Sequence, residues 1–323
     1  MQNLLDPAIL FFVFGVLAGA VGSNLEIPKS IAKFLSLYLL MALGLKGGFE
    51  LAKSGLTPGV LLSLGAAMSM AFIVPALGYA FLKNRVARYD AAAVAASYGS
   101  VSAVTFVTAM NFLESAGTSV GGHMAAAMVV MESPAIIMAV LLANSIRHHN
   151  AAASGAKASA TPIGKILHES FTDGAQLLLL GALAVGYISG ESGKVMMQPF
   201  STDLFKGMLA FFLLDMGLMV AKNFRDARQA SPVLIGYALL APLLHTSIAL
   251  GLAWLLGLPL GDATLLMVLS ASASYIVVPA VLRYAIPEAN PAIYFGLSLG
   301  ITFPLNITVG IPVYAAMART VLA

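Results

Sequence analysis

Residues 90–102 read DAAAVAASYGSVS, and residues 262–274 read DATLLMVLSASAS. The two stretches share three polar positions at one constant offset: Asp90 with Asp262, Ser100 with Ser272, and Ser102 with Ser274. Chance agreement between stretches rich in Ala, Ser and Leu is one explanation. An internal repeat is the other, and we favour it because all three matches fall in a single register.

Composition places these stretches in a membrane. Of the 323 residues, 59% are hydrophobic and 10% are charged, whereas roughly 25% of the residues of an ordinary soluble protein are charged. A mean hydropathy of +0.92 excludes a soluble enzyme and a disordered chain. The apolar runs are long rather than alternating, which favours helices over a β-barrel. The absence of cysteine excludes disulfides, thiolate metal sites and cysteine nucleophiles.

Ten apolar segments predict an all-α polytopic membrane protein with ten transmembrane helices, since one helical crossing takes about 20 residues. The segments are 7–23, 30–48, 58–82, 90–110, 122–146, 168–190, 203–221, 231–256, 262–283 and 291–318. The small, polar and basic stretch 147–165 predicts a flexible linker between residues 1–146 and 166–323. Five segments lie on each side of it, so the second half starts on the opposite membrane face, as in an inverted repeat.

The basic residues predict the orientation of the chain. Most of the 17 Lys and Arg residues follow the odd-numbered segments, so the positive-inside rule places the 147–165 linker in the cytoplasm. Both termini then lie outside, and we expect the protein to reside in a bacterial inner membrane.

The fourth and ninth segments are unusually polar for the middle of a membrane. Ser270, Ser272 and Ser274 alternate, so they share one side of the chain only if the backbone there is extended. Ser97 and Thr105 fit one helical face, so helix packing remains an alternative for the fourth segment. We expect both segments to be broken and to cross, bringing half-helix N-termini to the midplane, where free N–H groups suit a small anion.

Glu132 lies in the middle of the fifth segment, two residues before Pro134. A carboxylate at this depth is costly unless it meets a cation, a proton or a partner. Pro134 leaves a backbone carbonyl free, and hard cations such as sodium favour oxygen ligands. Thr302 and Asn306 are the polar counterpart in the last segment. The alternative is a structural carboxyl bonded to a neighbouring hydroxyl.

Several enzyme motifs are missing. The sequence has no phosphate-binding Gly-Lys-Ser/Thr loop and no HExxH, and its five His residues form no ligand cluster. We therefore expect no enzymatic activity and no cofactor, and we expect an ion gradient rather than ATP to drive transport.

Four short elements occur in order along the chain: residues 43–48 (LGLKGG), 98–105 (YGSVSAVT), 131–135 (MESPA) and 282–292 (LRYAIPEANPA). Together they resemble the cyanobacterial-type sodium-dependent bicarbonate transporters, the SbtA-type permeases. The resemblance implies a gate domain from segments 1, 2, 6 and 7 and a core domain from segments 3–5 and 8–10. It also implies a homotrimer, an elevator-like movement, sodium-coupled bicarbonate import and a PII-like cytosolic regulator, although the linker is shorter than in many members.

The resemblance places bicarbonate where segments 4 and 9 meet. Our candidate substrate ligands are Ser100, Ser102, Thr105, Ser272, Ser274 and Tyr275. Our candidate sodium ligands are Ser97, Glu132, Ser270, Thr302 and Asn306.

One position departs from the family pattern. Tyr275 stands where the family carries an aspartate after its serines. A phenol is a weak, neutral ligand but a good hydrogen-bond donor, so Tyr275 either changes the ion coupling, serves the anion, or fills space. Two other functions remain open. They are ion-coupled transport of another small anion or a monocarboxylate, and a channel or membrane sensor, which would need a continuous polar stripe along several segments.

Overall fold

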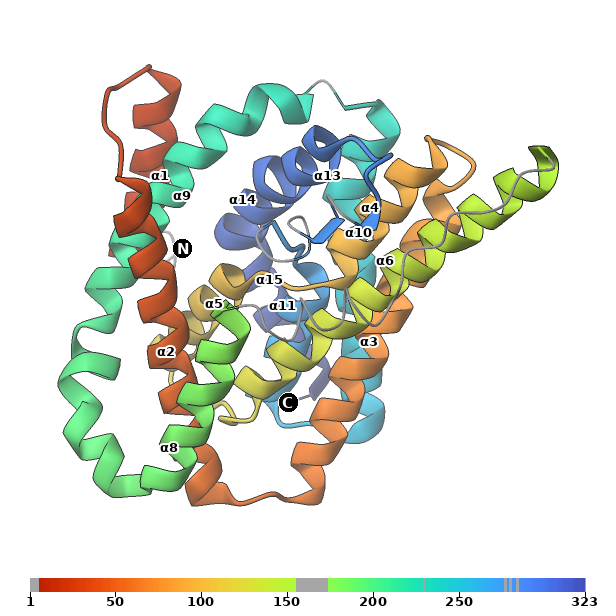
Figure 1. The fold of residues 1–323 in the computed structure, drawn as a ribbon. Helices are drawn as coiled ribbons and strands as arrows, with labels where there is room; N and C mark the ends of the chain where they lie inside the picture. Colours follow the sequence, from red (N-terminus) through yellow and green to blue (C-terminus); the bar gives the residue numbers. More distant parts are fainter. Residues whose placement is uncertain are drawn as a thin grey trace.

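The computed structural model describes residues 6–154, 174–228, 230–275, 278, 281–282 and 285–322, and it contains helices but no strands in this part of the chain (Figure 1). The first half comprises α1 (Pro7–Ala20), α2 (Lys29–Ser54), α3 (Pro58–Leu82), α4 (Arg88–Gly99), α5 (Ala103–Ser115) and α6 (Met124–Ser154). The second half comprises α8 (Gly174–Gln198), η2 (Pro199–Asp203), α9 (Phe205–Arg228), α10 (Pro232–Leu256), α11 (Leu260–Ala271), α13 (Pro291–Leu297), η3 (Ser298–Thr302), α14 (Phe303–Leu305), η4 (Asn306–Gly310) and α15 (Ile311–Leu322). The prediction of an all-α fold is confirmed.

Helix length and composition fit a membrane. Seven helical stretches among the described residues are long and apolar enough to cross one. One of them, Leu177–Lys222, extends over 46 residues, whereas one crossing needs about 20. Pro7–Ala20 and Leu260–Ala271 are apolar but shorter.

Helix α6 differs from the prediction. It continues to Ser154, so the first part of the predicted 147–165 linker is helical. Alanines at 151–153 favour helix and no Gly or Pro interrupts the stretch, which explains the extension. The remainder of the predicted linker, 155–165, lies outside the described residues.

Four helices form one side of the molecule: α1, α2, α8 and α9, seen together on the left of Figure 1. Helix α1 packs along α9, and α2 packs along α8. Glycine permits the close approach, because a Cβ on Gly44 of α2 would lie 2.6 Å from the Leu179 carbonyl oxygen of α8. Gly217 of α9 lies as tightly against the backbone of α1. Packing through small residues is usual between membrane helices. We call these four helices the gate side and the remaining helices the core side.

Helices α4 and α11 lie inside the core side, and both are 12 residues long. Every residue of α4 from Ala91 to Gly99 and of α11 from Gly261 to Ala271 is buried. Helices that end in the middle of a membrane are tolerated only where protein covers their free backbone groups. This enclosure therefore permits a break at the end of each.

An acidic residue ties each of these helices to the other half of the chain. The Asp90 carboxylate accepts a hydrogen bond from the Asn290 N–H at 2.7 Å, and the Asp262 carboxylate accepts one from the Gly121 N–H at 2.6 Å. Both carboxylates lie in the first turn of their helix, where negative charge is favourable. Equivalent positions thus make equivalent contacts.

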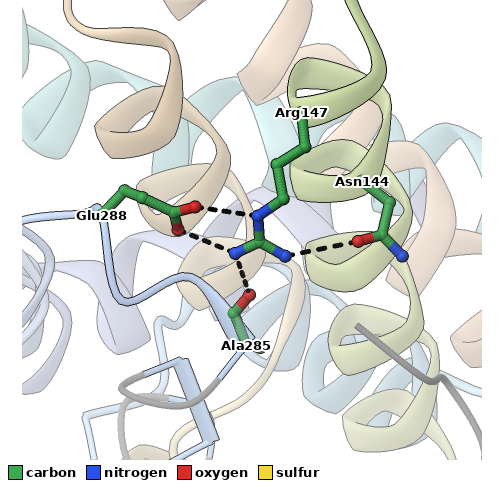
Figure 2. A network of polar contacts seen from close by, with 4 residues as sticks. All are labelled: Asn144, Arg147, Ala285 and Glu288. Carbon is green, nitrogen blue, oxygen red and sulfur yellow. Dashed lines mark hydrogen bonds and ion pairs between the residues drawn. The ribbon is translucent and has the colours of Figure 1, made fainter. Parts of the chain in front are cut away.

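Arg147, near the end of α6, fastens the loop that precedes α13 (Figure 2). Its Nε and Nη2 donate to the two Glu288 oxygens at 2.8 and 2.7 Å, and Nη2 also donates to the Ala285 carbonyl at 3.0 Å. Nη1 donates to the Asn144 side-chain oxygen at 3.3 Å. This two-point contact holds the pKa of Glu288 below its usual range, because ionised Glu288 accepts hydrogen bonds from a fixed cation.

Arg147→Lys is expected to lower thermal stability slightly, because lysine keeps the charge but loses the paired geometry. Partly exposed ion pairs contribute up to about 1 kcal/mol. The pKa of Glu288 is lower in the folded state than in the unfolded state, so the ion pair stabilises the folded protein at neutral pH. This stabilisation is lost as the pH falls below the unfolded pKa of about 4.3 and then through the folded pKa. Melting curves at a series of pH values should therefore converge for variant and wild type in acid. A constant difference across that range would contradict this assignment.

Candidate substrate site

The two predicted breaks are present in the structure. Helix α4 ends at Gly99 and α5 begins at Ala103, so residues 100–102 leave the helix. Ser100 is extended, and so is Ser272 directly after α11. The ring of Pro75 on α3 lies against the end of α4, where a Cβ on Gly99 would come within 2.7 Å of it. The predicted break in the ninth segment is therefore present, but it begins only at Ser272. Ser270 still lies within the helix α11, so the expectation that all three alternating serines belong to one extended stretch is wrong for Ser270.

The breaks are hydrogen-bonded to each other. The Ser102 N–H donates to the Ser272 hydroxyl oxygen at 3.0 Å, and the Ser274 N–H donates to the Ser97 carbonyl at 2.8 Å. The Ser272 hydroxyl in turn donates to the Leu269 carbonyl at 2.8 Å. The Ser272 hydroxyl thus joins the two extended segments. Its hydrogen and one of its lone pairs are both used in hydrogen bonds within the protein.

Ser272→Ala is therefore expected to destabilise the protein by about 1–3 kcal/mol, because the buried Ser102 N–H loses its acceptor. The effect should appear first in thermal stability in detergent. Ser63→Ala is a matched control, since Ser63 is also buried but bonds only to the preceding turn of α3. Equal stability losses in the two variants would show that the contact between the breaks adds nothing.

Ser102 and Ser274 occupy equivalent places after the breaks. The Ser102 hydroxyl oxygen accepts from the Thr105 N–H at 3.2 Å, and that of Ser274 accepts from the Val278 N–H at 3.3 Å. Each therefore caps the chain that follows, as serine commonly does. Because these bonds use a lone pair, each hydroxyl retains its hydrogen for an anionic ligand.

A cavity of about 60 Å³ lies where the breaks face the gate side. Its polar lining comes from Ser36, Ser102, Glu132, Ser274 and Tyr275. Its other lining residues are Leu39, Leu40, Val101, Ala103, Val104, Val107, Met128, Leu179 and Phe212. The cavity exceeds several-fold the roughly 10–15 Å³ that a single water needs. One serine from each break thus reaches a shared space large enough for a small ion.

A family model for the Na+-dependent bicarbonate transporter superfamily matches residues 7–319, nearly the whole chain. The chain belongs to this superfamily. The resemblance drawn from four short elements is confirmed. No individual curated protein matches the chain. Membership and the long apolar helices together make the chain an integral membrane protein of a transporter family, which supports transport rather than enzymatic activity.

The six predicted substrate ligands fall into three groups. Ser102, Ser274 and Tyr275 line the cavity. Ser100 and Thr105 are buried beside the break, and neither hydroxyl has a hydrogen-bond partner among the described residues. Ser272 is engaged between the breaks, as described above. The structure thus brings three of the six candidates to one space.

The aromatic ring of Tyr275 packs against a neighbouring ring. The ring packs edge-on against Phe303 with centroids 5.2 Å apart, and the side chain is buried. Its hydroxyl lies near the Ser102 hydroxyl but makes no hydrogen bond of normal geometry with the described residues. The phenol hydroxyl is thus buried close to the Ser102 hydroxyl, at the edge of the cavity.

The predicted sodium ligands are also divided. Glu132 lines the cavity, whereas Ser97, Ser270, Thr302 and Asn306 are buried and do not line it. Thr302 donates to the Ala238 carbonyl at 2.9 Å and also contacts the Tyr98 hydroxyl at 2.5 Å. Among the described residues no three His, Asp or Glu side chains gather as a metal cluster.

Asn306 is hydrogen-bonded to the end of α11, directly before the second break. Its amide nitrogen donates to the Ala271 carbonyl at 2.9 Å, and its amide oxygen accepts from the Tyr314 hydroxyl at 2.8 Å. Asn306 begins η4, a wide π-type turn of the kind frequent at functional sites. The Ser270 hydroxyl donates to the Leu266 carbonyl, while the Ser97 hydroxyl has no partner among the described residues.

Sequence reasoning missed the gate-side wall of the cavity. Ser36, Leu39 and Leu40 of α2 and Phe212 of α9 form part of it. Ser36 is a polar residue within an apolar segment, which is a weak signal. The sequence offers no sign of which segments face the breaks, because that depends on packing between distant helices.

Proposed function

We propose that this protein is a sodium-coupled secondary transporter that imports bicarbonate. The observation that carries the proposal is the cavity lined by Ser102 and Ser274, one from each break, together with Glu132. Hydroxyl donors close to the N-terminus of a helix suit a small anion. An anion and a carboxylate in one space repel each other unless a cation or a proton neutralises one of them, which favours symport.

We propose further that the chain is built as two inverted five-helix repeats with ten crossings. Asp90 and Asp262, and likewise Ser102 and Ser274, make equivalent contacts in the two halves. The pairing of α1 with α9 and of α2 with α8 has the same exchange symmetry. The 46-residue stretch Leu177–Lys222 is long enough for two crossings. The family and the basic residues favour a homotrimer in the bacterial inner membrane with both termini outside.

An elevator-like movement of the core side against the gate side is part of the proposal. The cavity lies between these two parts, so a sliding core would carry the anion with it. Lys46 of α2 lies 3.6 Å from Glu114 of α5, and Asn111 of α5 donates to Asp6 at 3.4 Å. Such a movement would have to break these two contacts.

Flux of labelled bicarbonate into proteoliposomes tests the proposal. Uptake should saturate with bicarbonate and should require an inward sodium gradient, with choline as the control cation. A flux that neither saturates nor responds to sodium would indicate a channel. No flux above that of protein-free liposomes would contradict transport of bicarbonate altogether.

Tyr275→Phe is expected to weaken bicarbonate binding about two- to tenfold, because it removes one donor and keeps the ring that packs on Phe303. Tyr275→Asp should strengthen sodium dependence, since it adds a negative charge beside the cavity. Equilibrium binding at several sodium concentrations measures both effects. If Tyr275→Phe binds like wild type and Tyr275→Asp does not assemble, the phenol only fills space.

A further inference from the structure

The cavity is polar at the breaks, at Glu132 and at Ser36, and apolar over most of the rest of its lining. Its apolar wall includes Leu39, Leu40 and Phe212 from the gate side and Val104, Val107 and Met128 from the core side. No lysine, arginine or histidine is among the described residues that line it. A ligand in this space therefore meets hydroxyl donors over a limited area and hydrocarbon over most of its surface.

A lining with few polar groups and a large apolar area also suits anions that carry an apolar group, which bicarbonate lacks. Bicarbonate carries oxygens in three directions, and each oxygen that faces hydrocarbon loses water without gaining a hydrogen bond. A carboxylate with a short alkyl group has one polar end and one apolar end. Its alkyl group gains from leaving water, because burying one methylene improves binding about fourfold.

The cavity has room for a small alkyl group. Its volume of about 60 Å³ is several times the roughly 10–15 Å³ that one water needs. Acetate and propionate, with four and five non-hydrogen atoms, are therefore the acids that we expect to bind.

We propose that short-chain monocarboxylates of the acetate and propionate class are substrates of this site, with the carboxylate at the Ser102 and Ser274 hydroxyls and the alkyl group against the apolar wall. The inference rests on the proposed function, because it needs an anion seated at the breaks. It goes beyond that function by naming a second substrate class and the residues that select it.

The test is equilibrium binding to the purified protein in detergent, which avoids leakage of protonated acids through liposomes. Labelled bicarbonate is bound at pH 8 in sodium chloride, and formate, acetate and propionate are added as competitors. Potency should rise about fourfold per carbon from formate to propionate. Bicarbonate binding that none of the acids displaces would overturn the inference and leave the proposed function intact.

Direct binding of labelled propionate separates the remaining outcomes. Propionate binding that Ser274→Ala leaves unchanged would place it elsewhere and overturn the inference. Failure of both labelled ligands to bind would contradict the proposed function itself. Val107→Thr, which keeps the side-chain shape and adds a hydroxyl, should weaken propionate severalfold more than bicarbonate. If Val107→Thr does not fold, Val104→Thr replaces it. A variant that weakens propionate and bicarbonate binding equally would overturn the proposed role of the apolar wall.

Discussion

Ser274→Ala is expected to weaken bicarbonate binding about five- to 150-fold, because it removes a hydrogen-bond donor at a buried side chain. The Ser274 hydroxyl lines the cavity, and its oxygen already accepts from the Val278 N–H, so its hydrogen is the part left for the anion. Ser102→Ala should act similarly, since Ser102 has the equivalent position after the first break. Equilibrium binding to purified protein measures both effects.

The same substitutions also cost stability. Ser102→Ala removes the N-cap of α5, and Ser274→Ala removes the acceptor of the Val278 N–H. Loss of a cap costs about 1 kcal/mol. Ser274→Thr separates capping from binding, because threonine keeps a hydroxyl for both. Ser63→Ala is the matched control, since Ser63 is buried away from the cavity. If Ser102→Ala and Ser274→Ala both assemble and bind bicarbonate normally, the anion site lies elsewhere in the protein.

Local signals explain why so much of the helical pattern was predictable. Segment 58–82 coincides with α3, which begins at Pro58 and ends at Leu82, directly before a basic loop. Proline suits the first turn of a helix, and a membrane demands that apolar backbone be helical. The alternation of Ser270, Ser272 and Ser274 predicted the second break for an equally local reason, although the helix continues past Ser270 and the backbone is extended only from Ser272. Nothing of this kind marked the end of α6.

Contacts between segments that are distant along the chain could not be predicted from the sequence. The bond from the Ser102 N–H to Ser272 depends on how two helices cross, and neither residue alone implies it. The predicted sodium ligands show the same limit, because Glu132 reaches the cavity whereas Thr302 bonds to Ala238 and Tyr98. Residue type indicated which groups carry chemistry, and packing decided which of them share a space.

Glu132→Gln is expected to raise the sodium concentration needed for half-maximal bicarbonate binding about 10- to 150-fold. Glutamine keeps the shape and loses the charge, and interactions with a charged group are worth roughly 1.5–3 kcal/mol. Binding without sodium should change less, because Ser102 and Ser274 remain. Sodium titrations of bicarbonate binding measure the shift, and thermal stability reports assembly.

Two control variants distinguish loss of the Glu132 charge from a general effect of substituting a carboxylate. Glu132→Asp keeps the charge on a shorter side chain, so it should retain sodium dependence with weakened affinity. Glu50→Gln removes a carboxylate that pairs with Lys194 on the gate side, away from the cavity lining, and should leave the sodium titration unchanged. A Glu132→Gln protein with unaltered sodium dependence would make Glu132 a structural carboxyl. The cation would then have to bind at the other four predicted ligands, which do not line the cavity and supply only neutral oxygens. These ligands are Ser97, Ser270, Thr302 and Asn306.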